Sequence, residues 1–170
     1  MELQLERSDV AQVASISSRN TLALLPVGKK NKQKFVVGDD SGTLNCFEIK
    51  KGEPQTVFKF PTENGPVVCV AMGGPAAKKD KIFASFGSRL SGLTKKGKEF
   101  FKLTSALTEP IQHMVVEDTR IWTGCEYIYN LYEDGRDAGF FMAGDRINAL
   151  AVESVISEAE MNPVLGCQDR

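Results

Sequence analysis

A repeat of strands and turns, about 40 residues long, constrains the fold more than any other feature of the sequence. Three segments share one layout, in which an apolar strand, a polar turn and a second strand lead to a glycine turn; they are FVVGDDSGTLNCFEIKKGE (35–53), IFASFGSRLSGLTKKGKEF (82–100) and IWTGCEYIYNLYEDGRD (121–137). Gly52, Gly97 and Gly135 each follow two polar residues. Because glycine adopts a positive φ without strain, we expect a hairpin turn at each of these positions.

Two further series of short apolar segments extend every unit. One series precedes the hairpins, at 21–27, 66–72, 111–117 and 147–153, and the other follows them, at 56–60, 100–104 and 139–144. Each unit then holds four strands, which is typical of a β-propeller blade. A β-sandwich is the alternative, but it does not predict self-similar units. The last segment also has helix propensity, and its place in the series favours a strand followed by a loop.

The sequence therefore predicts an all-β fold, a β-propeller of about three and a half four-stranded blades that belong to a larger ring. Its predicted parts are a closing strand in 1–18, blade 1 in 20–60, blade 2 in 66–104, blade 3 in 111–144 and the start of blade 4 in 147–170. The closing strand would pair with the last blade of the ring or with a partner's sheet. Since propellers typically close with 4–8 blades, we expect the chain to be the beginning of a longer protein.

The composition limits the cellular compartment and the kinds of partner that are expected for this chain. The net charge of −1 and the pI of about 5.9 argue against nucleic acid as a partner. The first residues lack the features of a signal peptide, and no apolar run has the length of a membrane span, so we expect a cytoplasmic protein. Cys46, Cys69, Cys125 and Cys167 lack the spacing of a zinc site; their even number would allow two disulfides, but strand cysteines in a chain without a signal peptide favour reduced core residues.

No segment carries a recognisable catalytic, metal or cofactor signature. GGPAAKKDK (73–81) lacks the second glycine and the hydroxyl residue of a phosphate loop, and FGSRLSG (86–92) departs from a nucleophile elbow. His113 is the only histidine, and its place in an inner strand favours packing or a channel lining. Asp39 and Asp40 lack the further ligands of a calcium loop, so a turn is favoured. We expect no enzyme and no cofactor.

The charged residues do show a pattern once blade topology is assumed. In an up-and-down blade, the first and third turns lie on one face of the propeller. In blades 1 and 2 these turns contain most of the chain's lysines: Lys29, Lys30, Lys32, Lys34, Lys50, Lys51, Lys78, Lys79, Lys81, Lys95, Lys96 and Lys98. In blades 3 and 4 the corresponding positions are acidic: Glu117, Asp118, Glu133, Asp134, Asp137, Glu153, Glu158 and Glu160.

The lysines have a functional and a structural interpretation. They could form a docking surface for an acidic partner or for anionic lipid headgroups, each lysine contributing about 1 kcal/mol near such a membrane. They could equally be solvated turn residues that keep hairpins and edges soluble. Reversing the charge of turn lysines separates the two interpretations.

Several segments carry a resemblance to a known family. KFVVGDDSGTLNCFEIKKGE, KIFASFGSRLSGLTKKGKEF, LTEPIQHM, YIYNLYEDGRD, GDRINAL and PVLGCQDR together resemble, in order, the N-terminal propeller of the seventh Bardet–Biedl syndrome protein family. The resemblance spans nearly the whole chain. It implies a seven-bladed propeller followed by coiled-coil, β-sandwich and helical parts, and membership of the BBSome, a coat-like complex of cilia.

The resemblance also implies a function and a location. It implies a non-catalytic scaffold that helps to move membrane proteins into and out of cilia, with other BBSome subunits as partners, especially the second and ninth Bardet–Biedl proteins. A small Arf-like GTPase recruits that complex to membranes. The implied locations are the cilium, the ciliary base with its basal body, and the periphery of the ciliary membrane. The alternative is a self-contained β protein that binds a peptide or ligand and closes its sheet by self-association.

Overall fold

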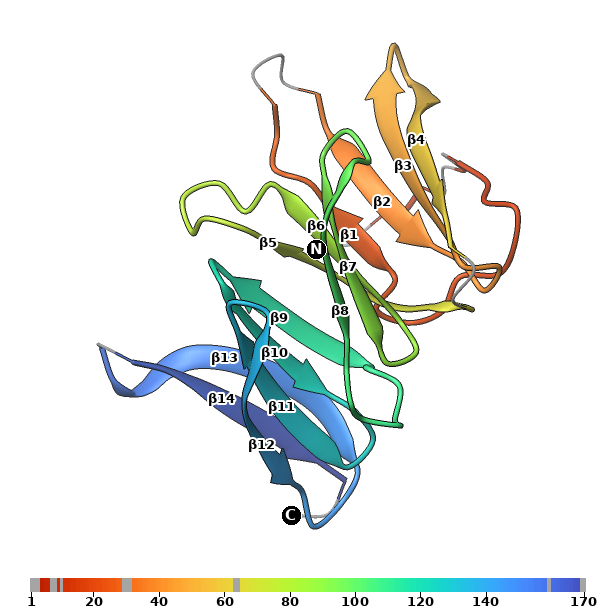
Figure 1. Ribbon diagram of the computed structural model, residues 1–170. Coiled ribbons are helices and arrows are strands. Elements are labelled where there is room, and N and C mark those ends of the chain that lie inside the picture. The colour runs from red at the N-terminus through yellow and green to blue at the C-terminus, as the bar shows by residue number, and fades with distance from the viewer. Residues whose placement is uncertain are drawn as a thin grey trace.

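The computed structural model describes residues 4–6, 9, 11–28, 32–62, 65–158 and 160–168. In these ranges every regular element is a β-strand, and the strands form three four-stranded sheets and one two-stranded sheet. Each sheet pairs its strands in chain order, and the sheets follow one another as blades (Figure 1). The predicted propeller fold with three and a half blades is therefore confirmed.

The strands divide among the blades in the order of the chain. Blade 1 contains β1 (Leu22–Leu24), β2 (Lys34–Gly38), β3 (Thr43–Lys50) and β4 (Glu53–Pro61). Blade 2 contains β5 (Val67–Gly73), β6 (Lys81–Phe86), β7 (Arg89–Thr94) and β8 (Glu99–Thr104). Blade 3 contains β9 (His113–Glu117), β10 (Arg120–Gly124), β11 (Ile128–Glu133) and β12 (Arg136–Met142). The half-blade contains β13 (Ile147–Ser157) and β14 (Glu160–Cys167).

The glycine turns have the backbone that the sequence predicted. Gly52, Gly97 and Gly135 have φ values of 83°, 82° and 74°. Lys51 also has a positive φ, of 55°, so Lys51 and Gly52 form a two-residue hairpin turn whose twist matches that of the flanking strands. Because this turn is so short, Lys50 pairs directly with Glu53, and β4 starts three residues before the predicted strand 56–60.

The half-blade differs from the prediction of a strand followed by a loop. β13 continues past Glu153 to Ser157, and Ser157 pairs with Glu160 of β14 across a tight turn. The register shifts between Glu153 and Ser157, so the outer part of this hairpin pairs irregularly, and the β-branched Val155 and Ile156 favour the extended backbone there. The extended hairpin is visible as the blue ribbon at the lower left of Figure 1.

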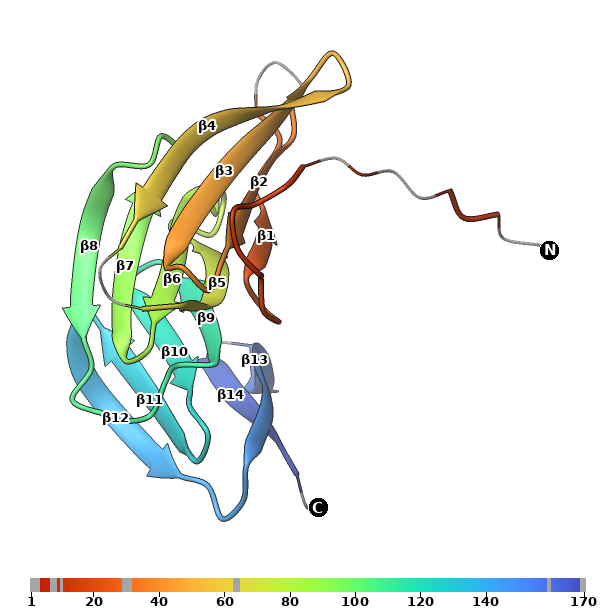
Figure 2. The same cartoon turned by 90° about the vertical axis from the view of Figure 1, so that its right-hand side faces the viewer.

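The first strand of each blade lies on the inner side of the arc and the fourth lies outside. Figure 2 shows β1, β5, β9 and β13 along the concave side and β4, β8 and β12 along the convex side. Two apolar clusters fill the spaces between blades. Val36, Leu44 and Ile82 are fully buried between blades 1 and 2, and Leu90 and Ile111 are fully buried between blades 2 and 3. Inter-blade packing is thus the main source of hydrophobic stabilisation.

The segment ahead of blade 1 was predicted to supply a closing strand. Its described residues 4–6, 9 and 11–18 form no strand. Ile16 lies against blade 1, where its carbonyl accepts a hydrogen bond from the Asp40 amide at 2.8 Å. Pairing of residues 1–18 with the last blade of a ring, or with a partner's sheet, stays a prediction.

The acidic turn of blade 1 is held by its own side chains. Asp39 is fully buried, and its Oδ1 accepts hydrogen bonds from the amides of Ser41 and Thr43, at 3.1 and 3.0 Å. Its Oδ2 accepts one from Asn45 Nδ2 at 3.2 Å. The carboxylate oxygens therefore satisfy the turn itself, which agrees with the interpretation of this stretch as a turn.

Candidate interaction surface

The lysines of blades 1 and 2 lie on the face of the arc that carries the turns β1–β2, β3–β4, β5–β6 and β7–β8. The antiparallel order of both sheets requires these turns to share one side. The described lysines of this face, called here the lysine face, are Lys32, Lys34, Lys50, Lys51, Lys78, Lys79, Lys81, Lys95, Lys96 and Lys98. Lys29 and Lys30, which were predicted to belong to it, lie outside the described residues.

The members of the lysine face differ in exposure. Seven of them are exposed and lie in or next to the turns; the half-buried ones are Lys32, Lys34 and Lys81. Lys34 and Lys81 occupy equivalent places, as the first residues of β2 and β6. Their aliphatic stems can cover apolar surface while the ammonium groups reach solvent. Both blades therefore place lysine ammonium groups at the surface near their common border.

A cleft lies along that border. It has a volume of about 490 Å³, and it is lined by Leu25, Pro26, Val27, Gly28, Lys32, Lys34 and Glu48 of blade 1 and by Ala77, Lys78, Asp80 and Lys95 of blade 2. Part of the lining is apolar, since Leu25 is buried there and Val27 presents an exposed side chain. We call this the basic cleft, because four ammonium groups and two carboxylates surround it.

Ion pairs neutralise part of the basic cleft. Asp80 pairs with Lys81 at 3.2 Å and with Lys95 at 3.8 Å, so the pKa of the Asp80 carboxyl is lowered, chiefly by its hydrogen bond with Lys81. Glu48 lies 4.0 Å from Lys32. Among the described residues no carboxylate pairs with Lys34 or Lys78. The cleft keeps a positive excess, which would attract an anionic group.

The acidic half of the face is less uniform than the sequence predicted. Arg120 and Glu133 form an ion pair at 2.9 Å between the ends of β10 and β11, and Arg136 begins β12 beside them. Glu153 was assigned to a turn, which is wrong, because the longer β13 places it inside the strand. The turns of blade 3 therefore carry mixed charge, and the stronger electrostatic signal is on blades 1 and 2.

The structure also shows the surroundings of the cysteines and of His113, which the sequence offered as further candidates. In the part of the chain that the structure describes, no three His, Cys, Asp or Glu side chains come together as metal ligands would. The described ranges also hold no helix with the length and apolar character of a membrane span. Burial raises the pKa of the Cys46 thiol to about 11 and that of Cys125 to about 12, which holds both as thiols. Burial lowers the pKa of His113, the first residue of β9.

The sequence of this chain matches the model of a known protein family. A family model described as the BBS7 beta-propeller matches residues 22–170. The chain belongs to the BBS7 β-propeller family. This agrees with the resemblance seen in the sequence, and it accounts for the repeated four-stranded units.

Curated relatives cover the chain almost completely. The mouse protein named BBSome complex member BBS7 is 39% identical over 173 residues, which cover 100% of this chain and 24% of the mouse protein. The Caenorhabditis elegans protein named BBSome complex member bbs-7 is 31% identical over 168 residues, which cover 95% of this chain and 23% of the worm protein. The chain spans about a quarter of the length of these BBS7 relatives.

Solved structures support the fold alone. The computationally designed Ika4 protein has a TM-score of 0.68 at 14% identity, and the match covers 98% of this chain and 94% of the designed one. A structure of BBS1N in complex with ARL6DN has a TM-score of 0.64 at 12% identity, and the match covers 93% of this chain and 50% of the other. The BBS7 family member therefore shares its blade arrangement with proteins of only 12–14% sequence identity.

The sequence placed the described lysines on one face of the blades but did not predict the shape of the surface there. Pro26 and Val27 were assigned to the end of a strand, whereas β1 ends at Leu24 and these residues form one wall of the basic cleft. The proline is the available signal, because it cannot donate to a strand ladder. No sequence pattern indicates that Pro26 and Val27 of blade 1 line the same cleft as Ala77 and Asp80 of blade 2.

Proposed function

We propose that this propeller is a non-catalytic scaffold module of the BBSome, and that it acts in ciliary membrane-protein transport by presenting binding surfaces to other subunits. Membership of the BBS7 β-propeller family supports this proposal. The names of both curated relatives contain the words BBSome complex member. The module would work at the cilium, including the ciliary base, the basal body and the cytoplasmic side of the ciliary membrane.

The observation that carries the docking role is the convergence of lysines from two blades on one border. The basic cleft combines an apolar lining with Lys34 and Lys78, which form no ion pair with a carboxylate of the described residues, and a docking site for an acidic, partly apolar segment requires both features. We propose the second and ninth Bardet–Biedl proteins as the first partners to test. An anionic membrane surface is the second candidate, since lysines of the same face would contribute about 1 kcal/mol each near anionic lipid.

The test is a charge reversal with a matched control. Lys50→Glu with Lys96→Glu changes two exposed turn residues of the lysine face, whereas Lys59→Glu with Lys102→Glu makes the same change on β4 and β8, outside it. Each lost attraction and new repulsion at a docking surface costs about 1 kcal/mol, so we expect the first pair to weaken co-purification with the two partner subunits at least tenfold. Adding Lys51→Glu and Lys95→Glu should weaken it further.

The controls separate the two candidate partners. Co-sedimentation with phosphatidylserine vesicles at low salt measures membrane binding, and pull-down of the two subunits measures assembly. Loss of only one readout identifies the partner of the lysine face. Equal binding by both charge-reversed pairs in both assays would contradict the docking role and leave solvated turn lysines as the explanation.

A further inference from the structure

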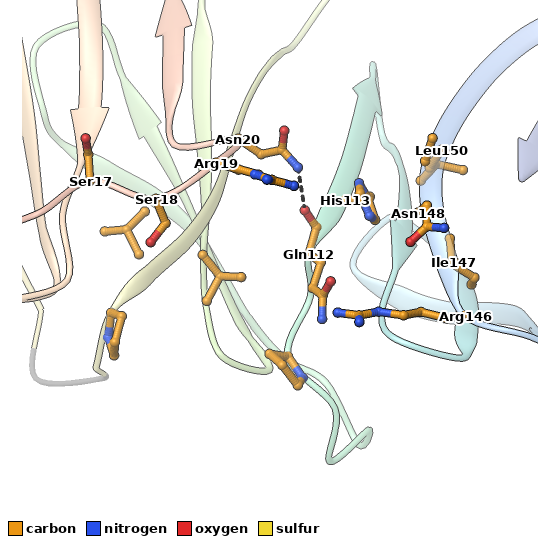
Figure 3. Close-up of a pocket in the computed structure, with 15 residues that line it drawn as sticks. Ser17, Ser18, Arg19, Asn20, Gln112, His113, Arg146, Ile147, Asn148 and Leu150 are labelled. Atoms are coloured by element: carbon orange, nitrogen blue, oxygen red, sulfur yellow. Dashed lines mark hydrogen bonds between the residues drawn. The ribbon is translucent and has the colours of Figure 1, made fainter. Parts of the chain in front are cut away.

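A second cavity lies on the opposite side of the arc from the lysine face, where the inner strands of all the blades begin. Its volume is about 1000 Å³ (Figure 3). It is lined by residues 17–20 ahead of β1, 66–68 at the start of β5, 110 and 112–113 at the start of β9, and 146–150 at the start of β13. We call it the inner-strand cavity, because each blade contributes to it at or just ahead of its first strand.

The polar side chains of this cavity are two arginines, three amides, one histidine and the hydroxyls of Ser17 and Ser18. They include the guanidinium groups of Arg19 and Arg146, the amides of Asn20, Gln112 and Asn148, and the imidazole of His113, whose pKa is lowered by burial. None of the described lining residues is an aspartate or a glutamate. The basic cleft, by contrast, contains its own carboxylates. The inner-strand cavity therefore has hydrogen-bond donors and positive charge without an internal counter-ion.

Few carboxylates neutralise the positive charges of Arg19 and Arg146. Among the described residues no carboxylate forms an ion pair with Arg19. Arg146 has one partner, Glu126, whose Oε1 is 3.7 Å from Nε and which does not line the cavity. Figure 3 shows Arg146 pointing toward Gln112, and Arg19 next to Asn20. A guanidinium group offers a planar fork of N–H donors that matches carboxylate and phosphate oxygens.

Two of the strands that border the cavity contain β-bulges. β5 has a register shift between Val67 and Cys69, and β13 has one between Ile147 and Ala149. The residues inserted at these bulges, Val68 and Asn148, both line the cavity. Bulges re-aim side chains and occur preferentially beside functional sites. A hydrogen bond of 3.3 Å from Asn20 Nδ2 to the Gln112 carbonyl further ties the blade 1 side to the blade 3 side.

We propose that the inner-strand cavity binds an oxyanion, a carboxylate or phosphate group held by Arg19 and Arg146 with the surrounding amides as further donors. This site is distinct from the lysine face and from the subunit contacts proposed for it. Its size suits a small polyanionic molecule, because ligand pockets usually have volumes of about 300–1,000 Å³.

The test titrates inorganic phosphate and, separately, citrate into the isotope-labelled chain at constant ionic strength, with amide NMR shifts as the readout. We expect saturable shifts confined to the four lining segments. Each lost guanidinium should weaken binding about tenfold, so Arg19→Gln with Arg146→Gln should weaken it far more than either single change. Arg120→Gln, which removes an arginine outside the cavity, is the matched control and should bind as the unmodified chain does.

The two probes distinguish the ligand chemistry. Tighter citrate binding supports a carboxylate ligand, and tighter phosphate binding supports a phosphate ligand. Arg146→Lys keeps the charge but loses the fork, so a partial loss is expected even if the double variant folds poorly. The proposal is overturned if neither probe gives saturable shifts at the lining segments, or if the arginine variants bind as tightly as Arg120→Gln.

Discussion

Substituting Gly38 with alanine should force blades 1 and 2 apart. Gly38 ends β2 and is buried, and a Cβ atom there would lie 2.6 Å from the Cβ of Val67 at the start of β5. Carbon atoms in contact normally lie about 3.5–4.0 Å apart, so the two strands must separate by about 1 Å. No rotamer of Val67 relieves this clash, because its Cβ is attached directly to the backbone.

The cost follows from overpacking in a rigid interior. Inserted methyl groups typically cost about 1–3 kcal/mol, and we expect about 3 kcal/mol at Gly38, since relief requires backbone movement. For a chain of this size, that loss should lower the melting temperature by about 6–12 °C. Val67 and its neighbour Val36 are buried in the same inter-blade cluster, so separation would also expose apolar surface.

The matched control is Gly139→Ala in β12. A Cβ atom at Gly139 meets nothing within 4 Å, and its φ is not in the left-handed region. Alanine there restricts the unfolded chain and should stabilise by about 0.5 kcal/mol. Gly73→Ala repeats the Gly38 geometry between blades 2 and 3, since its Cβ would lie 2.6 Å from the Cβ of Val116.

Thermal unfolding followed by far-UV circular dichroism compares the three variants. The expected order of melting temperature places Gly139→Ala at or above the unmodified chain and the other two well below it. Gly38→Ala with Val67→Ala should recover only part of the loss, because the valine Cβ remains. If Gly38→Ala and Gly139→Ala melt at the same temperature, close glycine contacts do not set the blade spacing.

Two further predictions concern buried groups. Asn130 has no hydrogen-bond partner for its buried side chain among the described residues, whereas the side chain of Asn45, at the same place in blade 1, donates to Asp39. We therefore expect Asn130→Leu to be neutral or stabilising and Asn45→Leu to cost about 1–3 kcal/mol in urea unfolding; equal effects would contradict this accounting. Burial raises the pKa of Cys69 from 9.0 to about 12, so the unfolded chain loses this proton first, and the associated stability falls as the pH rises from about 9 toward 12. Cys69→Ala should flatten that fall in urea unfolding at alkaline pH, and an unchanged pH dependence would show that another group causes it.

The repeat could be predicted because its determinants are local. The turn at Lys51 and Gly52 depends on residues that pair within one hairpin, and apolar alternation marks the strands beside it. The half-blade was the exception, since the β-branched Val155 and Ile156 were assigned to a loop although they favour a strand. The extent of β13 also depends on β14, with which Ser157 pairs through Glu160.

The candidate sites also divide into features that the sequence predicts and features that depend on contacts between blades. Turn lysines could be assigned to one face, because up-and-down strand order fixes the side on which a turn lies. The basic cleft could not be predicted, since it depends on how closely the β1–β2 loop approaches Asp80 of blade 2. Arg19 and Arg146 were overlooked for the same reason, as they are far apart in the chain and line one cavity only because the inner strands begin side by side.

By itself, the sequence determined the all-β propeller class, the positions of the hairpin turns and the family, because these depend on short-range patterns that repeat along the chain. Only the tertiary structure decided which side chains of different blades meet. That outcome depends on the inter-blade distance, which is set where Gly38 packs against Val67 and Gly73 against Val116. Contacts of this kind join residues distant in sequence, and their energy arises from packing that no local pattern specifies.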